Sequence, residues 1–156
     1  MNANGNHASQ SELIEKHTET VDWLSSSILW KSELQNFQSM LEERALHTFS
    51  KAGKVDADHF QLMILHYLSE IEKLRGKLRN HETILGKLLE SNDVSLNQGG
   101  EEHECLMNLL ESFSKTYKQF RKEFFQFTLK PTSWQMKQRR KHIFFVVIVI
   151  VILISL

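Results

Sequence analysis

The fold of this chain is decided by the stretch from Phe60 to Leu88, which reads FQLMILHYLSEIEKLRGKLRNHETILGKL. Its apolar residues recur in alternating steps of four and three, which keeps one face of an α-helix turned toward a neighbouring helix. The positions on that face are Phe60, Ile64, Tyr67, Ile71, Leu74, Leu78, His81, Leu85 and Leu88. We predict a helix over about residues 57–91. Asp56 would be its N-cap, and Val55 with Phe60 a hydrophobic staple.

A second stretch repeats this spacing further along the chain. Its apolar face consists of His103, Leu106, Leu110, Phe113, Tyr117, Phe120, Phe124 and Phe127. We predict a helix over about residues 101–129, ended by Pro131 because the residue before a proline disfavours the helical conformation. Residues 92–100 are polar and end in Gly99-Gly100, which is typical of a connecting loop.

A third long helix is predicted upstream, over about residues 10–50. Ser9 and Glu12 match a capping box that would start it, and Gly53 would end it. Its apolar residues form two stripes that are out of phase: Ile14, His17, Val21, Leu24 and Ile28, then Trp30, Leu34, Phe37 and Leu41. We expect a bend or a change of packing partner near residues 25–27. Residues 1–8 are expected to be a disordered lead-in.

The three helices are joined by short connections, so neighbours should run antiparallel. One proline and six glycines among 156 residues also favour helix over strands and turns. The fold class is therefore all-α: an antiparallel three-helix bundle of long, coiled-coil-like helices over residues 9–130. Matching the helix levels at the loops places His103 beside His17 and Leu88, and His81 near Leu24 and Phe113.

The formal net charge of zero hides an uneven distribution. All 19 acidic residues precede position 129, but only 14 of the 19 basic residues do, which gives that part a net charge of −5. The other five basic residues lie in or next to a predicted basic linker, residues 131–142. An apolar tail, residues 143–156, follows it directly.

The tail with its basic neighbours predicts attachment to a membrane. Apolar side chains can enter a bilayer while Lys and Arg bind anionic headgroups, and basic residues before the segment favour a cytoplasmic body. Fourteen residues of helix cover about 21 Å, less than the hydrocarbon thickness of about 30 Å. The predicted membrane-binding residues are Arg139, Arg140, Lys141, Ile143, Phe144, Phe145, Val146, Val147, Ile148, Val149, Ile150, Val151, Ile152, Leu153 and Ile154.

Four short motifs resemble those of an uncharacterised family of small all-helical bundle proteins from Bacteroidota-type bacteria. They are Leu29-Trp30-Lys31-Ser32-Glu33-Leu34, Asp58-His59-Phe60-Gln61, His81-Glu82 and Lys122-Glu123-Phe124-Phe125-Gln126-Phe127. The resemblance covers about residues 14–127 and implies a helical bundle, with no known activity, cofactor or site. The apolar tail departs from the family pattern, which stops after the Phe-rich end.

Eight histidines raise the question of a metal site. Helical di-iron proteins use Glu-x-x-His pairs, and no histidine here has a glutamate three residues before it. His66 and Glu70 lie one helical turn apart and could hold a divalent ion, although two ligands make a weak site. The other candidates are His17, His81 and His103. We predict no metal or cofactor, with His81 and His103 near the helix seam beside polar partners, where they could make stability pH-dependent.

Catalytic and nucleic-acid-binding patterns are lacking, so we predict that the protein is not an enzyme and binds no nucleic acid. The single cysteine, Cys105, has three glutamates within four residues, and negative charge disfavours a reactive thiolate. Gly99-Gly100 lacks the lysine of a phosphate-binding loop. Basic runs within residues 73–79 and 115–122 are mixed with or flanked by glutamates, as on a solvated face.

Together these patterns predict a non-enzymatic scaffold or interaction module. Its body would be cytoplasmic, since residues 1–10 contain no apolar run and a lone cysteine suits a reducing compartment, and the tail would attach it to the inner membrane face. Trp23 and Trp30 would fill the core or a seam with a second copy or a partner helix. The alternative is a soluble metal- or ligand-binding bundle that uses His17, His81 and His103.

Overall fold

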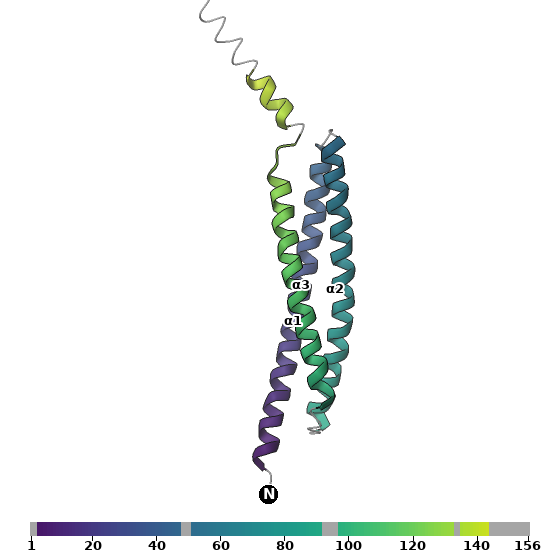
Figure 1. The fold of residues 1–156 in the computed structure, drawn as a ribbon, viewed down its shortest axis with the longest axis vertical. Coiled ribbons are helices and arrows are strands. Elements are labelled where there is room, and N and C mark those ends of the chain that lie inside the picture. Colours follow the sequence, from purple (N-terminus) through teal and green to yellow (C-terminus); the bar gives the residue numbers. More distant parts are fainter. Residues whose placement is uncertain (1–2, 48–50, 92–96, 133–134, 144–156) are drawn as a thin grey trace, which may run out of the picture.

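A computed structural model of the chain describes residues 3–47, 51–91, 97–132 and 135–143. In these ranges all regular secondary structure is helical. Three long helices, α1 (Ala3–Leu46), α2 (Lys51–Ser91) and α3 (Asn97–Leu129), lie lengthwise against one another (Figure 1). A shorter helix over residues 135–143 projects beyond the end of α3 (Figure 1).

Side-chain contacts fix the direction and register of the long helices. Three contacts between α1 and α3 join residues 84 positions apart: Glu19 with His103, Glu33 with Tyr117, and Arg44 with Thr128. A constant separation means that α1 and α3 run in the same direction. Between α1 and α2, residue numbers rise along one helix as they fall along the other: His17 contacts Glu82, and Lys31 contacts Glu72. These two helices therefore run in opposite directions.

The predicted apolar faces of the second and third helices are confirmed. Every predicted position from Phe60 to Leu85 in α2 is buried, and so is every one in α3 except the half-buried Phe113. Aromatic rings join the helices where α3 is rich in phenylalanine. The closest centroid distances are 4.5 Å for Phe37–Phe124, 4.7 Å for Phe60–Phe127 and 4.8 Å for Tyr67–Phe120. Such ring pairs stabilise the core beyond the area that they bury.

The predicted face of α1 is wrong in its first half. One line of buried positions has a continuous seven-residue spacing, and Phe37 is buried beside it; the positions of the line are Leu13, Thr20, Ser27, Leu34 and Leu41. Thr20 and Ser27 can be buried because each hydroxyl donates to a carbonyl of its own helix, at 2.7 Å and 2.6 Å. The predicted stripe residues Ile14, Val21 and Ile28 are instead exposed.

Helix starts also differ from the predicted ones. α1 begins by Ala3, so the capping-box motif at Ser9 lies inside the helix and residues 3–8 are helical rather than a disordered lead-in. α2 begins at Lys51, which places Asp56 beyond the first turn, and Val55 is 59% exposed rather than stapled. α3 begins at Asn97, ahead of the glycine pair. An N-cap motif does not start a helix where the residues before it are already helical. Tertiary packing contributes more to the stability of these helices than local propensity does.

The end of α3 agrees with the prediction from Pro131. The helix ends at Leu129, and Arg44 of α1 satisfies carbonyls that the end leaves free. Its guanidinium donates to the carbonyl oxygens of Thr128 at 3.0 Å and Lys130 at 2.7 Å, and lies over the ring of Phe127. This arrangement joins α1 to the end of α3 from which the C-terminal segment departs.

The predicted linker, residues 131–142, contains most of a short helix over residues 135–143. A capping box precedes that helix: the Thr132 amide donates to Gln135 Oε1 at 2.8 Å, and the Gln135 amide donates to Thr132 Oγ1 at 3.3 Å. The predicted membrane residues Arg139, Arg140, Lys141 and Ile143 are in this helix. The remaining ones, residues 144–154, lie outside the described ranges.

Candidate functional site

A line of polar side chains crosses the interior between the three long helices. His81 Nε2 of α2 lies 3.1 Å from His103 Nδ1 of α3, and His103 Nε2 lies 2.8 Å from Glu19 Oε2 of α1. Both rings are buried, and Trp23 stacks on His103 with centroids 4.6 Å apart. The contacts therefore tie α1, α2 and α3 together at one level.

If both rings are neutral, the hydrogen bonds allow one placement of their protons. The Glu19 carboxylate can only accept, so His103 Nε2–H donates to it, and the Nδ1 of a neutral His103 is then an acceptor. His81 Nε2–H donates to that nitrogen, which leaves His81 Nδ1 without a proton. Among the described residues, His81 Nδ1 is buried without a hydrogen-bond partner, because Glu102 Oε2, 3.4 Å away, is itself an acceptor.

The environment of His81 favours its neutral form. Burial lowers the pKa of His81 below its ordinary value; Glu102 opposes this effect, while His103 and Lys16 act in the same direction as burial. A proton added to this ring would enter at Nδ1, the nitrogen that faces Glu102. The group can thus hold or release one proton between the buried rings.

The predicted trio of His17, His81 and His103 does not converge on one point. His17 contacts Glu82 at 3.3 Å and is partly exposed, while the other two histidines bond to each other. Within the described ranges, no group of three or more His, Cys, Asp or Glu side chains is arranged to hold a metal ion. The expected level of His103 beside His17 is close, because His103 contacts Glu19; the level against α2 was wrong, because His103 lies opposite His81 rather than Leu88.

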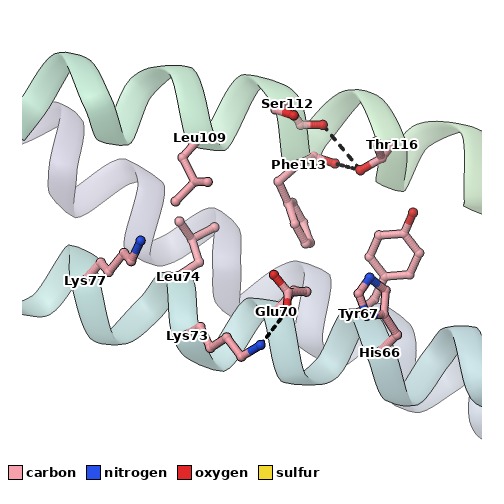
Figure 2. Close-up of a pocket in the computed structure, with 10 residues that line it drawn as sticks. All are labelled: His66, Tyr67, Glu70, Lys73, Leu74, Lys77, Leu109, Ser112, Phe113 and Thr116. Carbon is pink, nitrogen blue, oxygen red and sulfur yellow. Dashed lines mark hydrogen bonds and ion pairs between the residues drawn. The ribbon is translucent and has the colours of Figure 1, made fainter.

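The other candidate pair, His66 and Glu70, lies at a cleft of about 380 Å³ between α2 and α3. Figure 2 shows its apolar floor of Tyr67, Leu74, Leu109 and Phe113, and its rim of Lys73, Lys77, Ser112 and Thr116. Glu70 accepts a hydrogen bond from Lys73 Nζ at 2.7 Å, which lowers the pKa of its carboxyl. Glu70 is therefore ionised, which disfavours a role as a general acid.

A second polar group, which the sequence did not reveal, lies midway along the helices. Tyr117 OH of α3 donates to Glu33 Oε2 of α1 at 2.8 Å, and Arg121 Nη2 lies 2.8 Å from Glu33 Oε1. Burial and the Glu33 hydrogen bond raise the pKa of Tyr117 well above its ordinary value, so the phenol keeps its proton. The group joins α1 to α3 and offers no nucleophile. Tyr117 and Glu33 have the same 84-residue separation as His103 and Glu19.

The third feature is the helix over residues 135–143. Its basic residues Lys137, Arg139, Arg140 and Lys141 are all exposed, as is Ile143 at the start of the apolar tail. Among the described residues, no helix combines the length and apolar character that crossing a bilayer requires. Because the four basic side chains are exposed, they are accessible to an anionic surface.

Comparison of the chain with protein-family models, curated proteins and solved structures finds no match. The resemblance to a family of small helical bundle proteins therefore stays a prediction.

Proposed function

We propose that this protein is a non-enzymatic helical scaffold or interaction module. In this proposal α1, α2 and α3 form an antiparallel three-helix bundle with a cytoplasmic body. The C-terminal segment holds that body at the inner face of a membrane. The observation that carries the proposal is the exposed basic helix over residues 135–143, which runs directly into the apolar residues 143–156.

The chemistry of the C-terminal segment supports this attachment. Residues 143–156 contain a single polar side chain, Ser155, and leaving so many large apolar groups in water is unfavourable. Each Lys or Arg close to an anionic leaflet contributes about 1 kcal/mol of binding. Four exposed basic residues and an apolar tail supply two signals together, which stable attachment requires.

The interior of the helices supports a non-enzymatic role. The buried histidines bond to each other and to Glu19, and Tyr117 is protonated against Glu33. Glu70, at the cleft between α2 and α3, is engaged by Lys73. These polar groups connect helices and do not point together at an open position where a substrate would react.

Co-sedimentation with lipid vesicles tests the attachment. Full-length protein should bind vesicles that mix phosphatidylcholine with phosphatidylglycerol more strongly than phosphatidylcholine alone, and added salt should reduce the difference. A chain truncated before Ile143 should stay in the supernatant while keeping its helical circular dichroism. Equal sedimentation of the full-length and truncated proteins would refute the anchor.

A charge-reversal pair separates the basic helix from general electrostatics. Arg139→Glu, Arg140→Glu and Lys141→Glu together should abolish the preference for anionic vesicles. The matched control reverses three exposed lysines of α3: Lys115→Glu, Lys118→Glu and Lys122→Glu. The control should keep most of the preference, and an equal loss in both variants would contradict the role given to residues 139–141.

A further inference from the structure

One face of α1 lies away from the other long helices and carries no charge over nearly thirty residues. From Gln10 to Ser39 its positions are Gln10, Ile14, Thr18, Val21, Ser25, Ile28, Ser32, Gln35 and Ser39, all exposed. We call this set the uncharged face. About a quarter of the chain is charged, so an uncharged surface of this length is unusual for a solvated helix.

The uncharged face has the spacing of a helix-pairing seam. Ile14, Val21 and Ile28 recur every seven residues and are 51%, 41% and 53% exposed. Thr18 and Ser25 alternate with them, and their hydroxyls donate to the carbonyls of Ile14 and Val21 at 2.8 Å and 3.0 Å. The polar atoms between the apolar positions are therefore already satisfied, which lowers the cost of covering this face.

The residues beside the uncharged face select its occupant. One flank carries His17, Leu24 and Lys31, and the other carries Glu15, Asp22 and Leu29. If two copies pair in parallel, the flank with His17 in one copy meets the flank with Asp22 in the other. In antiparallel pairing, each flank meets the same flank of the second copy. The parallel arrangement places His17, which also contacts Glu82 of α2, against Asp22 of the second copy.

We infer that the uncharged face of α1 pairs, in parallel and in register, with the same face of a second copy of this chain. The parallel alignment also places Leu24 against Leu29 of the second copy, which would cover the 70% exposed Leu29 side chain. Antiparallel pairing would instead bring the acidic flanks, with Glu15 and Asp22, together. The pairing uses no residue of the C-terminal tail, so it stands or falls separately from membrane attachment.

The parallel arrangement has a structural consequence for the whole protein. Two parallel copies send their C-terminal segments out at the same end. If both segments bind one membrane, the second attachment becomes intramolecular, and two modest anchors act as a stronger one.

Disulfide trapping in the full-length chain, in detergent micelles, tests the pairing. With Cys105→Ser as background, Ile14→Cys, Val21→Cys and Ile28→Cys should each form a cross-linked dimer on oxidation with copper phenanthroline. Ser114→Cys, at an exposed position of α3, is the control and should stay monomeric. A mixture of the Ile14→Cys and Ile28→Cys chains should form the two homodimers and almost no heterodimer. Preferential heterodimer formation would show antiparallel pairing and overturn the inference.

Analytical ultracentrifugation provides the second test. Val21→Glu with Ile28→Glu should shift the protein from dimer to monomer without loss of helical signal. Leu62→Glu with Leu65→Glu alters two comparably exposed apolar residues of α2 and should leave the dimer intact. A wild-type protein that sediments as a monomer, or an equal loss of dimer in both variants, would overturn the inference.

Discussion

At the scale of single residues, the hydrogen bonds across the interior depend on where the protons of His81 and His103 lie. Glu19 fixes the tautomer of His103, and His103 fixes that of His81, so three helices share one hydrogen-bonded line. The last nitrogen of this line, His81 Nδ1, lies 3.4 Å from Glu102 Oε2. Burial favours the neutral form of His81, which in this line carries its proton on Nε2.

Acidification should therefore destabilise the protein through His81. The pKa of this ring is lowered in the folded state from 6.5, so unfolding takes up a proton at lower pH. The stability that comes from neutral His81 is fully present above pH 6.5 and is lost as the pH falls through the folded-state value. Thermal unfolding followed by circular dichroism should show a falling Tm between about pH 7 and about pH 5.

His81→Leu should reduce this pH dependence, because it removes the titrating ring at similar volume. His66→Gln alters an exposed histidine of the same helix and should keep the wild-type slope. If His81→Leu and the wild-type protein lose Tm equally on acidification, the proton assignment is wrong.

The sequence predicted part of this site. It placed His81 and His103 on the buried faces, because their spacing follows the apolar pattern of each helix. It did not pair them with each other or with Glu19, since periodicity defines a face but not the level of one helix against the next. A shift of the start of α3 by one turn moves every such pairing.

At the scale of the helices, side-chain size explains where prediction succeeded. The faces of α2 and α3 consist of large apolar residues and were predicted almost position by position. In α1 the seam passes through Thr20 and Ser27, which hydropathy treats as polar, while Ile14 and Val21 lie outside it. A hydroxyl that bonds to its own helix can be buried at little cost, so apolar spacing alone selects the wrong stripe.

Ser27→Leu tests the observed seam of α1. Ser27 is fully buried, so a larger side chain must displace its neighbours and should reduce the free energy of unfolding by about 1–3 kcal/mol. Ser69→Leu, at an exposed position of α2, should change it by less than about 0.5 kcal/mol. Urea unfolding measures both. A Ser27→Leu protein as stable as the Ser69→Leu protein would place Ser27 outside the core.

Gly76→Ala and Gly86→Ala should each stabilise α2. Both glycines lie inside the helix, and a methyl group at either position would meet no heavy atom within 4 Å. Alanine gains about 1 kcal/mol over glycine in a helix interior. The urea midpoint should rise with an unchanged m-value, and the two gains should add because the sites are separate. A lower midpoint in either variant would mean that the position is packed.

At the scale of the whole molecule, the two ends of the long helices differ. The end of α3 near Leu129 leads through Thr132 into the basic helix over residues 135–143 (Figure 1). Cys105 is exposed near the start of α3. At a rise of about 1.5 Å per residue, the two positions lie about 36 Å apart along α3. Attachment through the C-terminal segment therefore places Leu129 close to the membrane and Cys105 further from it.

Energy transfer from a dye on the protein to acceptors in the bilayer surface tests this claim most directly. The natural Cys105 takes the dye in one sample, and Leu129→Cys in a Cys105→Ser background takes it in the other. With full-length protein on vesicles that contain phosphatidylglycerol, transfer should be strong from position 129 and several-fold weaker from Cys105. Equal transfer from the two positions, or stronger transfer from Cys105, would contradict attachment through the C-terminal end.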